Sequence, residues 1–231
     1  MKKSKIFIIL TILSLTTFAQ KNEKAKNGIN LELLSFKQSS TNFESYINTV
    51  SDSLGVPGML TASPIQYGIG VSFLLNGLEF GADYSKSFST AKSNGTSSGR
   101  VGLTTFNVRL GPNFSLSKNL LFGCLLMLSS NEIKLDVASL TPAIPLRFKV
   151  SDNENMFRSY FLRGRFQIIF NIPTKGDFFS AVKLIPFYDV AITKHRFYDA
   201  SDNVLKNYNG EKTSNNNALG VKLAFTLASK K

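Results

Sequence analysis

Several residue types on which other protein classes depend are rare in this chain. Its 231 residues include one cysteine, Cys124, one histidine, His195, and no tryptophan. A single cysteine excludes an internal disulfide framework and any paired-cysteine redox or metal motif. The sequence has no metal-ligand spacing, so neither a metal nor another cofactor is expected. We expect Cys124 to pack as a small apolar residue beside Phe122 and Leu126.

Long apolar runs and charges are also scarce. After residue 20, no run approaches the roughly 18 apolar residues of a transmembrane helix. Charged residues make up 18% of the chain, whereas phenylalanine occurs 20 times and tyrosine 7 times. The mean hydropathy of +0.01 does not indicate a soluble protein, because barrel strands alternate apolar and polar residues and look average.

The first 19 residues have the pattern of a signal peptide. Lys2, Lys3 and Lys5 precede an apolar stretch at 6–15, and Thr17-Phe18-Ala19 places small residues at a cleavage site. We therefore predict that residues 1–19 are removed on export and that residues 20–231 form one domain. A retained N-terminal anchor is the alternative.

Apolar and polar residues alternate along several segments, the pattern of a strand with one apolar face. In 67–75 the apolar face carries Tyr67, Ile69 and Phe73, and the other face carries mostly glycine and serine. Asn76-Gly77 follows, a strong hairpin signal because both turn residues adopt positive φ. Eight strands are predicted, although 120–128 is apolar on both faces; they cover residues 28–37, 67–75, 78–85, 104–114, 120–128, 157–171, 178–192 and 218–227.

The predicted connections alternate in length. Those near 76–77, 115–119 and 172–177 are short, whereas the long ones cover residues 38–66, 86–100, 130–156 and 193–217. Short periplasmic turns and long extracellular loops are typical of outer-membrane barrels. An even number of strands then places both termini on the periplasmic side.

In plan the mature chain resembles the small outer-membrane β-barrel family, which includes OmpX and the transmembrane domain of OmpA. The resemblance rests on this architecture and on the export end at residues 17–20, not on a sequence motif. It implies an antiparallel up-and-down transmembrane β-barrel in the outer membrane of a Gram-negative bacterium, inserted by the barrel-assembly machinery. Such chains often end on an aromatic residue, whereas here Phe225 is followed by Thr-Leu-Ala-Ser-Lys-Lys.

Two other barrels fit the alternation. A soluble lipocalin-like barrel would turn its apolar face inward, and two extra strands within 130–156 would give a ten-stranded membrane barrel. Glycine and serine on the polar faces, charges of both signs there and the unequal loops favour eight strands with the apolar face outward.

Charged residues on the polar faces should then point into the lumen. Because an eight-stranded barrel has little interior space, these charges must pair or stay hydrated. We expect a salt-bridge network that fills the lumen; a narrow gated pore is the alternative. The predicted members of the network are Glu32, Glu79, Asp83, Asp189, Arg109, Arg163, Arg165, Lys183 and Lys222.

Two long connections contain patterns of their own. Thr41 and Glu44 have capping-box spacing, and a helical apolar face runs from Phe43 to Leu54. Alternation at 133–137 and again at 146–150 suggests an extracellular hairpin, which the 41–54 helix could cover as a cap. Basic residues flank this region and suggest a rim for an anionic ligand: Lys86, Lys92, Arg100, Lys194 and Arg196.

The sequence favours a non-enzymatic structural or surface-binding role through the extracellular loops. The formal net charge is +12, which suits lipopolysaccharide as a partner; nucleic acid is not expected, because the chain is exported and lacks a recognition motif. The alternative is a lipid-A-modifying enzyme that uses His195 with a serine and a carboxylate such as Asp189. No catalytic motif surrounds His195, and a solvated histidine at the rim is the simpler interpretation.

Overall fold

The computed structural model describes residues 27–40, 44–45, 47–48, 63–87, 92–93, 97–139, 156–176, 178–194, 196, 198 and 216–227. The predicted signal peptide lies outside these residues. Within them the chain is almost entirely β-strand, and no helix there is long and apolar enough to cross a membrane. The strands are β1 (Gly28–Ser40), β2 (Ile65–Leu75), β3 (Leu78–Ser87), β4 (Lys92–Ser93), β5 (Ser97–Ser117), β6 (Leu120–Ser139), β7 (Met156–Pro173), β8 (Phe179–Ala191) and β9 (Asn216–Leu227).

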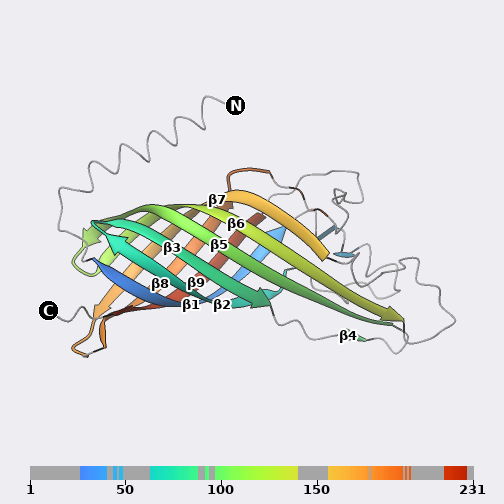
Figure 1. Cartoon of the computed structure of the whole chain (residues 1–231), viewed down its shortest axis with the longest axis horizontal. Helices are drawn as coiled ribbons and strands as arrows, with labels where there is room; N and C mark the ends of the chain where they lie inside the picture. Colours follow the sequence, from blue (N-terminus) through green and yellow to red (C-terminus); the bar gives the residue numbers. More distant parts are fainter. Residues whose placement is uncertain are drawn as a thin grey trace, which may run out of the picture.

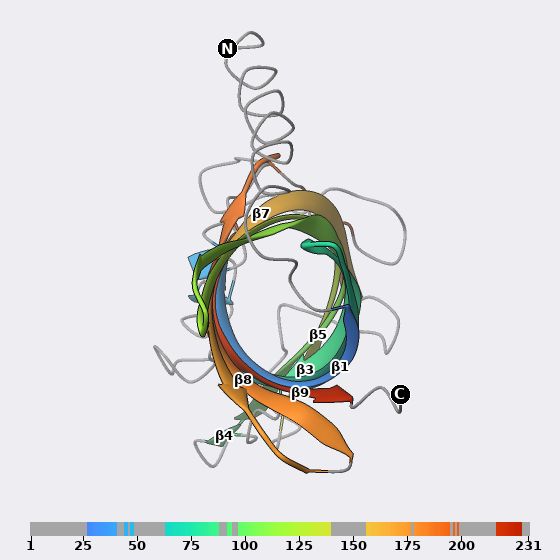
Figure 2. The same ribbon diagram turned by 90° about the vertical axis from the view of Figure 1, so that its left-hand side faces the viewer.

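Eight of these strands close into a barrel (Figures 1 and 2). Every strand pairing is antiparallel, and β1 joins β9 to complete the ring, while β3 pairs directly with β5. The two-residue β4 pairs only with the start of β5 and stands outside the ring. The predicted eight-stranded up-and-down barrel is confirmed, and the ten-stranded alternative is wrong.

The short turns gather at one end of the barrel. Asn76 and Gly77 have φ values of 50° and 83°, as the type I′ turn requires. Residues 118–119 join β5 to β6, and residues 174–178 join β7 to β8. Gly28 pairs with Leu74, so the start of β1 lies at the same end. This arrangement agrees with short periplasmic turns and periplasmic termini.

The apolar face of each strand points outward. Ile69 is 64% exposed and Tyr160 is 65% exposed, whereas the neighbouring inward Ser72 and Ser159 are fully buried. On β5 the outward face from Phe106 to Leu116 covers about 25 Å of height for strands tilted by about 40°, which matches the apolar band of an outer-membrane barrel. The soluble lipocalin-like alternative, which requires this face inward, is therefore wrong.

The structure resolves the ambiguous segment 120–128. Leu125 and Met127 are buried in the lumen, while Leu126 and Leu128 are exposed on the outer surface. Cys124 shares the outward face with Leu126 and is half-buried. The lumen therefore contains apolar side chains as well as charges, which is why alternation was hidden in this strand.

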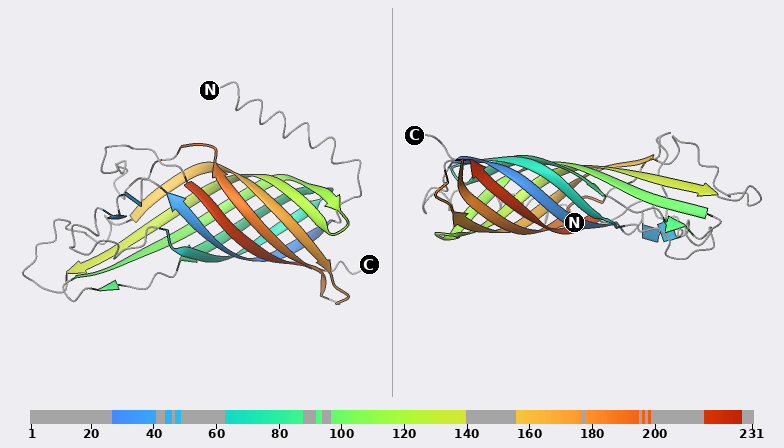
Figure 3. Two further views of the ribbon diagram at one scale, coloured as in Figure 1. Left: turned by 180° about the vertical axis from the view of Figure 1, so that it is seen from behind. Right: turned by 90° about the horizontal axis from the view of Figure 1, so that it is seen from below.

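β5 and β6 extend farther than predicted, beyond the extracellular ends of their neighbours (Figure 3). Residues 97–103 of β5 pair with 133–139 of β6, so parts of the predicted long connections 86–100 and 130–156 belong to these two strands. Here the inward face is apolar and the outward face is charged: Val101, Leu103 and Ile133 are buried, whereas Arg100 and Lys134 are exposed. This extension has the pattern of a water-soluble sheet, because the lipid no longer surrounds it.

The predicted extracellular hairpin is only partly right. Residues 133–137 do form a strand, but their partners are 99–103 of β5, and residues 146–150 lie outside the described residues. Of the predicted 41–54 helix, the described residues 44–45 and 47–48 are helical, and Ile47 is fully buried. Glu44 accepts hydrogen bonds from Ser39 at 3.0 Å and Ser63 at 2.5 Å, which ties this segment to the end of β1 and the approach to β2.

Candidate functional site

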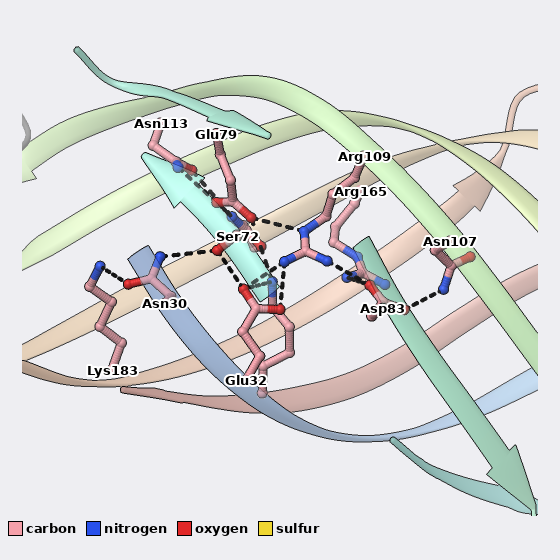
Figure 4. A network of polar contacts seen from close by, with 12 residues as sticks. Asn30, Glu32, Ser72, Glu79, Asp83, Asn107, Arg109, Asn113, Arg165 and Lys183 are labelled. Carbon is pink, nitrogen blue, oxygen red and sulfur yellow. Dashed lines mark hydrogen bonds and ion pairs between the residues drawn. The ribbon is translucent and has the colours of Figure 1, made fainter. Parts of the chain in front are cut away.

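The centre of the lumen is organised by Arg109 on β5 (Figure 4). Its three guanidinium nitrogens contact three carboxylates from two strands. Nη2 donates to Glu32 at 2.6 Å, Nε donates to Glu79 at 2.9 Å, and Nη1 donates to Asp83 at 2.6 Å. All four side chains are buried, and charge-assisted hydrogen bonds of this kind are roughly twice as strong as neutral ones.

Neutral side chains complete the coordination of these carboxylates. Asn113 and Gln167 each donate to Glu79 at 2.9 Å. Asn107 donates to Asp83 at 2.6 Å, and Ser72 donates to Glu32 at 2.8 Å. Each carboxylate therefore has partners beyond its arginine, which lowers the cost of burying it.

A second centre lies on β7 and β8. Arg165 donates two parallel hydrogen bonds to Asp189, at 2.7 and 2.9 Å. Its guanidinium also lies over the ring of Phe187, 3.9 Å from the centroid, a cation–π contact. The Nη1 atom of Arg165 is 3.7 Å from Asp83, so the two centres share a carboxylate.

The two lysines extend the network. Lys222 Nζ lies 3.6 Å from Glu32 and 3.8 Å from Glu79. Lys183 donates to Asn30 at 2.9 Å and is only partly buried, near the short-turn end. The nine residues that the sequence predicted for the lumen all occupy inward positions, and the structure brings them into contact with one another or with amides; we call them the lumen network.

Glycines on the lumen wall make room for the network. A Cβ atom on Gly81 would lie 2.8 Å from Arg109 Nη2 and 2.9 Å from the Cβ of Ser72. At Gly70 it would lie 3.1 Å from Glu32 Oε2. Glycine within a strand often marks a place where another group approaches the backbone closely, and here that group is the Arg109–Glu32 pair.

Apolar side chains occupy the lumen beside the charges. Phe36 and Phe187 pack with Leu34 and Ala218, and Ile169 packs with Ile185 and Ala224. Together with the paired charges they occupy much of the interior, so the arrangement suits a plug that joins the strands across the barrel.

The sequence missed the neutral members of this site. Asn30, Gln38 and Gln167 are all buried and bonded to charged residues. Their inward phase was readable, but amides on a polar face are equally typical of solvated positions. Only the distances across the barrel show which of them coordinate charge.

The predicted anionic-ligand rim divides into two separate groups. Lys86 and Arg100 are exposed on β3 and β5, and Lys92 lies on β4 beside them, although its side chain is outside the described residues. Lys194 and Arg196 are exposed beyond the end of β8, which neighbours β7 and β9. Strands β6 and β7 separate the groups on one side and β9, β1 and β2 on the other, so they do not form one patch.

The described residues offer little to a catalytic site. His195 lies outside them, and Asp189, its suggested partner, already accepts two hydrogen bonds from Arg165. Among the described residues there is no group of three or more His, Cys, Asp or Glu side chains that could hold a metal ion.

No protein-family model and no curated protein matches the chain, but solved structures do. It is similar to Neisserial surface protein A, with 15% identity, a TM-score of 0.48, and coverage of 88% of this chain and 99% of that one. It is also similar to the attachment invasion locus protein Ail of Yersinia pestis, solved with the heparin analogue sucrose octasulfate. The identity is 9%, the TM-score is 0.45, and the match covers 87% of this chain and 97% of that one. For the outer membrane protease OmpT of Escherichia coli, the identity is 9%, the TM-score is 0.42, and the match covers 90% of this chain and 100% of that one.

These similarities are remote, so the chain's own geometry defines its fold. Eight antiparallel strands close on themselves, an apolar belt faces outward, and paired charges lie in the interior. The chain has the fold of the small eight-stranded outer-membrane β-barrels.

Proposed function

We propose that this is an integral outer-membrane protein of a Gram-negative bacterium with a non-enzymatic structural or surface-binding role, and that its extracellular side binds lipopolysaccharide. The observation that supports this is where outward basic side chains lie on the strands. Each lies on the extracellular side of the last exposed apolar residue of its strand. These residues, which we call the outer basic ring, are Lys37, Lys86, Arg100, Lys134 and Arg158.

The ring adjoins the aromatic edge of the apolar belt. Lys86 pairs across the strands with Tyr67, which is 53% exposed, and Arg158 lies two residues from the exposed Tyr160. Aromatic side chains concentrate at membrane interfaces, so this edge should lie at the height of the lipid headgroups. A lysine or arginine near an anionic membrane surface contributes about 1 kcal/mol to the attraction, and lipopolysaccharide phosphates would provide that surface.

The interior supports a role without transport or catalysis. Buried ion pairs and apolar clusters occupy the lumen. Asp189, the lumen-network carboxylate nearest to His195 in sequence, is bound to Arg165. Binding would therefore take place on the outer surface and at the extracellular end.

The test compares unfolding temperatures in vesicles with and without lipopolysaccharide. The wild type should be stabilised by lipopolysaccharide, and the K37Q/K86Q/R158Q variant should lose most of this gain. The K118Q/K175Q variant, altered at exposed periplasmic turns, is the matched control and should keep it. Equal gains in both variants would refute the proposal, and new lipid A species in mass spectra of producing cells would favour the enzyme instead.

A further inference from the structure

The charges of the lumen network are unevenly distributed along the barrel. The deeper part holds three cations, Arg109, Lys183 and Lys222, together with three carboxylates, Glu32, Glu79 and Asp83. Among the described residues, the part nearer the extracellular end holds Arg163 and Arg165 with only one carboxylate, Asp189. Counted over these described residues, the extracellular half of the lumen has one more positive than negative charge.

That charge is located on Arg163. Asp189 forms both of its short hydrogen bonds with Arg165, and Arg163 Nη1 approaches it only to 3.7 Å. The hydrogen bonds of Arg163 come from Nη2, which donates to the neutral oxygens of Gln38 and Asn216, the latter at 2.9 Å. Nε and Nη1 have no hydrogen-bond partner among the described residues, and the side chain is fully buried.

Unpartnered donors surround this part of the lumen. Ten buried side-chain atoms of the described residues lack a hydrogen-bond partner, and eight of them are N–H or O–H groups. Six of those eight lie towards the extracellular end: Nε and Nη1 of Arg163, Nδ2 of Asn216, Nδ2 of Asn131, Oγ of Ser159 and Nε2 of Gln66.

The strand register places these donors in two groups, four residues apart along β7. Asn131 pairs directly with Ser159 and with Thr105, and Thr105 donates to Gln66 at 2.9 Å. Asn216 contacts Arg163 directly. Arg163 has only a long ion pair with Asp189 and a cation–π contact with Phe161, so an acceptor of negative charge beside it is favoured, because burying an incompletely paired charge is costly.

We infer that the extracellular half of the lumen is a binding site for one small anion, a halide or a small oxyanion such as phosphate. Nε and Nη1 of Arg163 donate to it, and Nδ2 of Asn216, whose Oδ1 accepts from Arg163, is a neutral donor beside them. The anion neutralises Arg163 and completes the ion pairing that Asp189 only half supplies. The site is a structural one that lies inside the barrel, separate from the outer basic ring.

The test uses the chain without residues 1–19 refolded in sodium chloride, bromide, phosphate or gluconate at equal ionic strength, gluconate being a much larger anion than the other three. Thermal unfolding is followed by far-UV circular dichroism, since the chain has no tryptophan. Above the dissociation constant, each tenfold increase in chloride or phosphate should raise the midpoint by about 3–6 °C, and gluconate should not. The better of chloride and phosphate identifies the anion class. Crystals grown in bromide should show an anomalous peak beside Arg163.

Two variants separate binding from general salt effects. Asn216→Asp places a carboxylate where Arg163 already has a hydrogen bond, so this variant should be at least as stable as the wild type in gluconate and should no longer respond to small anions. Lys118→Gln, at an exposed periplasmic turn, should respond as the wild type does. Equal wild-type midpoints in all four salts, an N216D variant that still responds, or bromide peaks only on the surface would each overturn the inference and leave water as the partner of these donors.

Discussion

Replacing Arg109 by methionine should be among the most damaging single changes in the lumen. The side chain is 1% exposed and binds Glu32, Glu79 and Asp83 directly. Methionine is similar in length but provides no donor or charge, so three buried carboxylates would lose their shortest ionic hydrogen bonds. Breaking one buried ion pair by removing a partner costs about 3–5 kcal/mol.

The loss should be less than three times that value, because each carboxylate keeps a second cation. Lys222 remains 3.6 Å from Glu32 and 3.8 Å from Glu79, and Arg165 remains 3.7 Å from Asp83. We therefore expect the free energy of unfolding to fall by about 4–6 kcal/mol. Adding Glu32→Gln to the Arg109→Met variant should recover about 1–2 kcal/mol, because it removes one of the poorly compensated charges.

The assay is urea unfolding of the refolded barrel in lipid vesicles, followed by far-UV circular dichroism and extrapolated linearly to water. Arg158→Met is the control, because Arg158 is exposed and lies 3.8 Å from the exposed Glu132; exposed pairs contribute about 0–1 kcal/mol. If Arg109→Met cost no more than Arg158→Met, the lumen network would not hold the strands together. If Glu32→Gln made the double variant still less stable, the electrostatic explanation would be wrong.

Three further outcomes are expected. Unheated protein should migrate differently from boiled protein on a denaturing gel, because a closed barrel resists the detergent, and identical migration would contradict closure. Reconstituted in planar bilayers, the protein should show little or no conductance, since ion pairs and apolar side chains cross the lumen; a steady porin-sized current would refute the plug. Gly77→Ala should lower the free energy of unfolding by about 1 kcal/mol, because φ is 83° at this turn, whereas an unchanged value would show that the turn relaxes without cost.

The strands that cross the apolar belt were predictable because every second residue there is apolar and faces the lipid. The hairpin at 76–77 was the clearest case, since its turn residues and both flanking faces point to the same structure. Segment 120–128 was ambiguous because Leu125 and Met127 face a lumen that tolerates apolar groups. A narrow interior needs volume as well as charge, and hydrophobicity alone does not report which side a residue faces.

The ends of β5 and β6 were mispredicted for a different reason. In the predicted strands most of the apolar residues lie on the outward face. Beyond Thr105 on β5 and Asn131 on β6, which pair with each other, the apolar residues lie on the inward face instead, so a search for one apolar face stops there. The strands continue past them with the opposite phase. The contacts inside the lumen were also beyond the sequence: it indicated which charges face inward, but Arg109 could have paired with any of four carboxylates until the register was known.

The position of the phase change has a physical meaning for the protein as a whole. Outside the membrane a sheet gains stability by burying its apolar face against protein, and inside the membrane it gains by presenting that face to lipid. One continuous pair of strands does both: Phe106 and Leu128 are exposed below the change, while Leu103 and Ile133 are buried above it. Sliding the barrel inward or outward by two residues would place apolar side chains in water or Glu132 in hydrocarbon. The paired change on β5 and β6 therefore sets the depth of the barrel in the bilayer, and it holds Arg100, Lys134 and Arg158 above the apolar band.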